Sequence, residues 1–139
     1  TRSPIWVGGG KSHGPTAERD YHQKLNKKMR RAAIAMVLSK KFADGELMVL
    51  DAMKMDAPKT KIFAEAMRGL LAMTKQKKNF DILVVPALEE KEVIRAGRNL
   101  PKSKVSNATS LNVYDLLNYK HLVIAQGAME TISKQFATK

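Results

Sequence analysis

The sequence contains no cysteine, and its other shortages exclude further classes of protein. Without cysteine, the 139 residues form no disulfide, no thiolate metal site and no cysteine nucleophile. The longest apolar runs, such as residues 82–88, are far shorter than the roughly 20 residues of a membrane-spanning helix. No signal-like apolar segment opens the chain. We therefore expect a protein of a reducing aqueous compartment.

Acidic residues are also scarce, because 13 Asp and Glu stand against 25 Lys and Arg and leave a net charge of +12. The apolar fraction of 44% is normal for a globular protein, so we expect one small domain with a core rather than a disordered chain. The positive excess favours a polyanionic partner, either nucleic acid or an anionic membrane surface. The membrane is the weaker alternative, because the basic segment has no amphipathic apolar stripe.

Half of the positive excess lies in residues 1–31, which hold eight basic and two acidic residues. The same segment is rich in glycine and contains two prolines, and it shows no apolar period before Leu25. These features predict an extended basic arm over residues 1–23, followed by a globular domain over residues 24–139.

Aromatic residues of the predicted arm alternate with its cations. Trp6, His13 and Tyr21 are interspersed with Arg and Lys, a mixture in which nucleobases stack on rings while cations contact phosphates. A run of three glycines also lets the backbone approach a polyanion closely. The arm therefore favours nucleic acid as the partner, and a merely solvated flexible tail is the alternative.

The rest of the sequence predicts alternating helices and strands. Asn26 is placed to cap a first helix with its side chain, and this helix ends at Gly45. Its predicted apolar face consists of Met29, Ala32, Ala33, Met36 and Val37. The later elements are a buried strand over 47–50, a helix from 58, a strand over 80–85, a helix over 89–98, a weak strand near 105, a helix over 112–118, a strand over 122–125 and a helix over 128–136.

Near-continuous apolar strands that alternate with helices are typical of a parallel sheet covered on both faces. We therefore predict an α/β fold, a compact three-layer domain with a central parallel sheet of about four strands and right-handed crossovers. The first helix begins with Lys27, Lys28, Arg30 and Arg31. Cations are unfavourable at the positive end of a helix dipole, so this turn indicates an anion bound outside it.

The fingerprints of nucleotide-dependent enzymes fail. The run from Gly10 to Ser12 resembles the end of a phosphate-binding loop, but Ile5 stands where that motif needs glycine. Of the eight glycines, only Gly127 directly follows a predicted strand. The three histidines lack metal-ligand spacing, and no nucleophile motif is present. We expect no enzyme, cofactor or metal. A small nucleotide- or ligand-binding α/β enzyme domain and a general nucleic-acid chaperone are the alternatives.

Several motifs together resemble the L-four family of large-subunit ribosomal proteins, in its bacterial or organellar form. They occur in the correct order over essentially the whole chain. In the arm they are RSPIW at 2–6, GGG at 8–10, HGP at 13–15, DY at 20–21, KL at 24–25 and NKKMRR at 26–31. In the domain they are LMVLD at 47–51, APKTK at 57–61, AGRNL at 96–100 and LNVYDLL at 111–117.

The resemblance implies a structural protein that binds ribosomal RNA, with an α/β domain on the outside of the large subunit and a long basic loop toward the peptide exit tunnel. Its expected location is the ribosome of the cytoplasm or of an organelle. Neighbouring large-subunit proteins are implied partners, and bacterial members also bind their own messenger leader. We expect no homo-oligomer. The implied RNA contacts are Arg2, Trp6, Gly8, Gly9, Gly10, Lys11, His13, Arg19, Tyr21, Lys24, Asn26, Lys27, Lys28, Arg30 and Arg31.

The chain departs from the family pattern at its start and within the arm. Members of the family begin well before the RSPIW motif, so the resemblance implies a truncated chain in which residues 2–23 are the returning half of the loop. Val7 stands where the family commonly has arginine, and Lys11 and Ser12 stand where it is often less basic. The total charge of the arm is kept, while individual contacts differ.

Overall fold

The fold, taken from a computed structural model, is described for residues 2–55, 57–73 and 80–136. The helices are α1 (Lys27–Ala43), α2 (Thr60–Met73), α3 (Lys91–Gly97), the 3-10 helix η1 (Ala108–Ser110), α4 (Val113–Asn118) and α5 (Gln126–Phe136). The strands are β1 (Leu47–Leu50), β2 (Ile82–Val85), β3 (Ser103–Val105) and β4 (His121–Ala125).

The four strands form one parallel sheet in the order β1-β4-β2-β3. The last strand in the sequence is therefore inserted between the first two, with Leu122 opposite both Leu47 and Leu83. The two central strands, β4 and β2, each have a neighbouring strand on both sides, and both are completely buried. The predicted parallel sheet of about four strands is confirmed.

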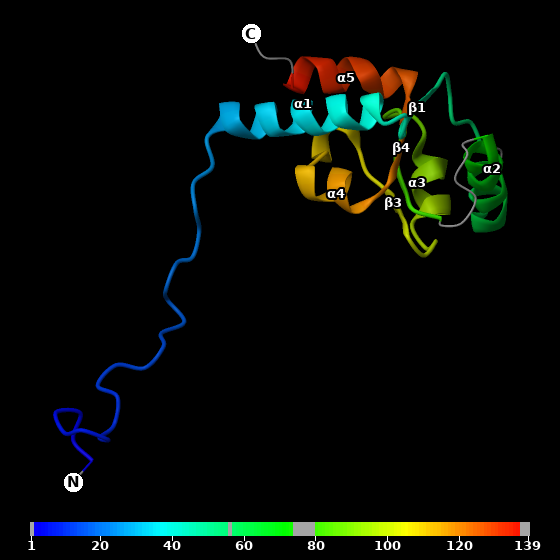
Figure 1. Cartoon of the computed structure of the whole chain (residues 1–139). Helices are drawn as coiled ribbons and strands as arrows, with labels where there is room; N and C mark the ends of the chain where they lie inside the picture. The colour runs from blue at the N-terminus through cyan, green and yellow to red at the C-terminus, as the bar shows by residue number, and fades with distance from the viewer. Residues whose placement is uncertain (1, 56, 74–79, 137–139) are drawn as a thin grey trace.

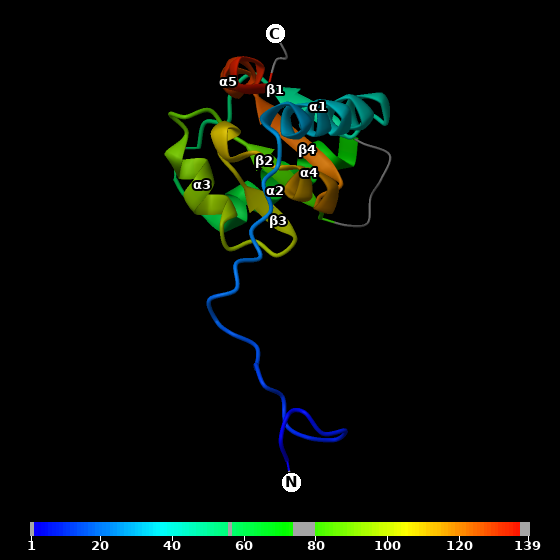
Figure 2. The same cartoon turned by 90° about the vertical axis from the view of Figure 1, so that its left-hand side faces the viewer.

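Helices cover both faces of this sheet (Figure 1). Successive side chains of a strand point to opposite faces, so Leu122 and Ile124 pack against α1, α4 and α5, while Val123 and Ala125 pack against α2 and α3. The turned view in Figure 2 shows the same arrangement, with the sheet between the helices. The predicted three-layer α/β architecture is therefore confirmed.

Several predicted boundaries and one burial pattern need correction. The strand over 47–50 is half-buried rather than buried, because β1 is an edge strand and leaves Val49 50% exposed. The central strands begin and end close to their predicted limits, and α3 and α5 start within two residues of them. The sequence did not predict η1, whose three residues are too few to show a helical period.

The predicted apolar face of α1 was correct only in part: Ala33 and Val37 are half-buried, and Val37 packs against the core. Met29, Ala32 and Met36 are exposed, whereas the fully buried residues are Ile34 and Lys41, which lie two turns apart on the side of the helix away from Met29 and Met36. Asn26 does occupy the N-cap position, but its side chain makes no capping hydrogen bond. Periodicity failed here because alanine and methionine continue around most of this helix and mark no single face.

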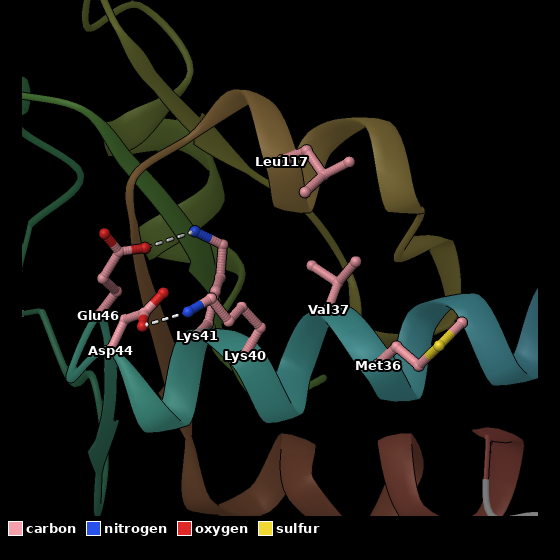
Figure 3. Close-up of a pocket in the computed structure, with 7 residues that line it drawn as sticks. All are labelled: Met36, Val37, Lys40, Lys41, Asp44, Glu46 and Leu117. Carbon is pink, nitrogen blue, oxygen red and sulfur yellow. Dashed lines mark hydrogen bonds and ion pairs between the residues drawn. The ribbon is translucent and has the colours of Figure 1, made fainter.

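Lys41 lies in the core-facing side of α1 because its ammonium group is fully bonded there. Its Nζ donates to the carbonyl oxygens of Lys120 at 2.7 Å and Tyr119 at 2.9 Å, and to Glu46 Oε2 at 3.2 Å. Figure 3 shows this group beside an open pocket of about 340 Å³ between α1 and α4. The lysine thus joins the end of α1 to the turn that leads into β4.

A buried histidine gives the domain a predicted pH dependence. His121 is 4% exposed and its Nδ1 lacks a hydrogen-bond partner in the described part of the chain. Burial first, and then the charge of Lys120, lowers the pKa of His121 below its ordinary value of 6.5. The unfolded chain therefore binds this proton more readily, so the free energy of unfolding falls as the pH drops through 6.5.

We expect thermal unfolding to show this loss between pH 7.5 and pH 5.5. His121→Gln removes the titrating ring, so its melting temperature should depend less on pH over that range than that of the unsubstituted chain. Parallel curves for the two proteins would contradict the assignment.

Candidate nucleic-acid interface

Residues 2–26 form an arm that leaves the domain at the start of α1 and extends far from it (Figures 1 and 2). No helix or strand forms between residues 2 and 26, as glycine, proline and the lack of an apolar period predicted. Of the fifteen residues expected to contact RNA, all are exposed except Gly9, which is half-buried. None of them is taken up by the core of the domain.

The outer end of the arm is a closed loop over residues 2–10. The amide of Gly10 donates a hydrogen bond to the carbonyl oxygen of Arg2 at 3.0 Å. The amide of Trp6 donates to the carbonyl oxygen of Ser3 at 3.1 Å, and the amide of Gly9 donates to that of Trp6 at 2.9 Å. Gly8 adopts a φ of +78°, in the region that favours glycine. The triple glycine therefore serves a local turn, a role that the sequence analysis did not predict, since it expected these glycines to let the backbone approach a polyanion.

Further along the arm, a local contact pairs an aromatic ring with a cation. The guanidinium carbon of Arg19 lies 5.0 Å from the centre of the Tyr21 ring, within the range of a cation–π contact. Asp20 Oδ1 accepts a hydrogen bond from the backbone amide of His22 at 2.8 Å. The ring and the guanidinium are thus held together and both stay exposed, which suits stacking on a base next to a phosphate.

A second basic cluster lies at the first turns of α1, well separated from the loop at the end of the arm (Figure 1). No acidic residue offsets it in the first turn of this helix. Among the described residues, Lys27, Lys28, Arg30 and Arg31 form no ion pair, and all four are exposed. We call these four residues the α1 basic cluster.

Part of the α1 basic cluster lines a groove that the sequence did not predict. Lys27, Arg30 and Arg31 border a space of about 270 Å³, with Gln135 and Phe136 at the end of α5 on its other side. The start of α1 lies beside the end of α5, where a helix dipole favours cations. This proximity partly offsets the unfavourable position of the cations on α1 and still leaves their charged ends accessible.

The described residues give little support to the alternatives of an enzyme, a nucleotide-binding domain or a membrane-bound protein. Among residues 2–55, 57–73 and 80–136, no three His, Asp or Glu gather as a metal would require. No strand precedes Gly10 and Lys11 in the described arm, so the context of a phosphate-binding loop is absent. A pocket of about 320 Å³ near the carboxyl end of β1 is lined mostly by apolar groups such as Met53 and Phe63. Within the described residues, no helix has the length and apolar character needed to cross a bilayer.

Comparison with known proteins decides the family. The model of the ribosomal protein L4/L1 family matches residues 1–135. The chain belongs to this family. It is 44% identical over 137 residues to a protein of Lachnospira eligens named large ribosomal subunit protein uL4. The matched region covers 99% of this chain and 63% of that relative. A uL4 protein of Desulfatibacillum aliphaticivorans is 44% identical over 131 residues, covering 94% of the chain and 60% of the relative. The chain therefore spans about three fifths of the length of these relatives.

The family assignment confirms the resemblance drawn from the motifs of the arm and of the domain. Three residues beside the candidate interface were not predicted from the sequence. They are the exposed Ile5 and Val7 at the end of the arm, and Gln135, which lines the groove. The first two could have been found from a large apolar pair that flanks Trp6 in a segment without a core. Nothing local in the sequence indicated Gln135, because its position depends on the packing of α5 against α1.

Proposed function

We propose that this chain is a structural constituent of the large ribosomal subunit and binds ribosomal RNA through its arm and the α1 basic cluster. The observation that carries the proposal is an arm with exposed cations and rings on a member of a ribosomal protein family. In this proposal, residues 1–23 bind RNA and residues 24–139 form the rigid domain from which the arm starts. The uL4 relatives are bacterial, so the proposed location is the ribosome in the bacterial cytoplasm.

The proposed mechanism is positioning rather than catalysis. Phosphates that contact Lys and Arg release their counterions, and this release drives association in a salt-dependent way. The core on one face of the sheet holds α1 through Ile34, Val37 and Leu38, so the point at which the arm leaves the domain is fixed before RNA binds. A fixed starting point lets the arm support folding of RNA during subunit assembly and reach toward the region of the exit tunnel, with neighbouring ribosomal proteins as further partners.

The family assignment argues against the two alternatives from the sequence. A ligand-binding enzyme domain predicts that a nucleotide raises the melting temperature of the chain, and a general nucleic-acid chaperone predicts equal affinity for any RNA. Neither behaviour follows from a preshaped arm on a ribosomal protein.

Filter binding of the intact chain to large-subunit and small-subunit ribosomal RNA tests the proposal. At about 0.15 M salt we expect tighter binding to large-subunit RNA, because non-specific phosphate contacts are the same for both RNAs while shaped contacts are not. Equal affinity for the two RNAs at every salt concentration would contradict it.

A further inference from the structure

The loop over residues 2–10 exposes three consecutive large apolar side chains at the far end of the arm. Ile5, Trp6 and Val7 are 93%, 63% and 107% exposed. We call these three residues the apolar tip. A flexible tail would expose such residues only on average, whereas here three backbone hydrogen bonds close the loop that carries them. The apolar tip is therefore a preformed surface that lacks a covering layer in the described chain.

Gly9 is the residue that allows the loop to close. A Cβ atom at this position would overlap the carbonyl oxygen of Ser3 and would lie 2.9 Å from the carbonyl oxygen of Trp6. These neighbours are backbone atoms and cannot move aside without opening the loop. Gly14, in contrast, has open space around its hypothetical Cβ, so it offers a matched control in the same arm.

The charges around the apolar tip favour RNA as its partner. Residues 2–17 contain Arg2 and Lys11 and no acidic residue, so a cation stands on each side of the tip. Duplex RNA presents a charged backbone and a groove of sugar hydroxyls, so contacts with a duplex would use the two cations and would leave the apolar side chains without a matching surface. Three large apolar side chains instead match the faces of nucleobases, which are available where bases are unstacked.

We propose that the apolar tip is an RNA recognition wedge that packs against unstacked bases in a non-helical segment of ribosomal RNA. The proposal rests on the function proposed above and specifies the kind of RNA site that the arm takes. Arg2 and Lys11 hold the phosphates on either side, Trp6 stacks on a base, and Ile5 and Val7 fill the space beside it. Gly9 also acts as a positioning residue, because it closes the loop that carries these side chains.

The test combines ultraviolet crosslinking with filter binding, using the intact chain and purified bacterial large-subunit ribosomal RNA as the probe. Crosslinks that depend on Trp6 should map to nucleotides that are unpaired in the RNA. Trp6→Ala should weaken binding by about 5- to 150-fold, the range for loss of one stacked base. The dependence of affinity on salt should stay unchanged, because no phosphate contact is removed.

The loop closure has its own pair of variants. Gly9→Ala should weaken binding by at least about 5-fold, since alanine is incompatible with the closed backbone. Gly14→Ala, in the same arm but with open space for a Cβ, should cause a clearly smaller loss. Neither substitution lies in the domain, so equal far-ultraviolet circular dichroism would confirm that the domain is intact.

The possible results separate this proposal from the proposed function. Crosslinks confined to continuous duplex would overturn the wedge, and so would affinities of both Trp6→Ala and Gly9→Ala equal to that of the unsubstituted chain. Salt-dependent binding of the chain to RNA would still leave the proposed ribosomal function in place. Absence of binding to the large-subunit RNA by the unsubstituted chain would overturn both. Crosslinks at unpaired nucleotides together with the loss on Gly9→Ala would support the wedge.

Discussion

Replacing all four residues of the α1 basic cluster with alanine is expected to lower the salt dependence of RNA binding by about 3 in the slope of log affinity against log salt. The value follows from a loss of about 0.7 to 0.9 in slope for each phosphate contact removed. The four residues carry no ion pair in the described chain, and their charged ends are exposed beside the arm. The measurement is filter binding to large-subunit ribosomal RNA from about 0.05 to 0.4 M salt.

A matched variant separates this effect from loss of charge in general. Lys54, Lys59, Lys61 and Lys91 are also exposed and lie away from the arm, on the side of the domain that carries α2 and α3. Their replacement with alanine removes the same charge and should leave the slope close to that of the unsubstituted chain. If both quadruple variants lower the slope equally, the α1 basic cluster has no special part in binding.

The second large effect concerns the stability of the domain. Lys41→Ala should reduce the free energy of unfolding by about 3 kcal/mol, because it leaves Glu46 and two backbone carbonyl oxygens without the buried ammonium group that they bond. For a domain of this size, such a loss lowers the melting temperature by roughly 10 °C. Thermal unfolding followed by circular dichroism measures it.

The neighbouring lysine provides the control. Lys40 Nζ lies 2.8 Å from Asp44 Oδ1, but its side chain is 74% exposed, so solvent screens the pair. The nearby carboxylate raises the pKa of Lys40 without making the pair important for folding. Lys40→Ala should therefore melt close to the unsubstituted chain. Equal melting temperatures for the two alanine variants would show that burial of Lys41 does not matter.

The sheet could be predicted because its strands are strongly apolar and are separated by helical segments. A central strand such as β2 is buried on both faces and therefore consists of consecutive apolar residues, and these apolar runs identified the strands in the sequence. The order of the strands could not be read in the same way. Insertion of β4 between β1 and β2 depends on which helix covers which face, and no local pattern records that choice.

The face of α1 could be predicted from periodicity only in part, for a related reason. Lys41 is a charged residue on the buried face, and only the distant carbonyls of Tyr119 and Lys120 make that position favourable. Apolar Met36 on the outer face then competes as a false signal. Long-range polar contacts of this kind decide burial without leaving a mark in the local sequence.

The candidate interface was predictable in composition and less so in shape. Clustered cations, three glycines and interspersed rings predicted an extended basic arm over residues 1–23, and the structure has no helix or strand over residues 2–26. Closure of the loop at Gly9 could not be predicted from the sequence, because it depends on the carbonyl groups of Ser3 and Trp6, which lie where a Cβ atom of residue 9 would be. The groove beside Arg31 required the packing of α5, which brings Gln135 next to it.

The most direct test of the central claim is sedimentation of the tagged 139-residue chain from a bacterial extract through gradients at low and high salt. The account predicts that the chain migrates with the large ribosomal subunit and stays there at high salt, because an arm surrounded by RNA is held by shape as well as charge. Release into the free fraction already at low salt would contradict it, since the positive charge would then act only as a non-specific attraction.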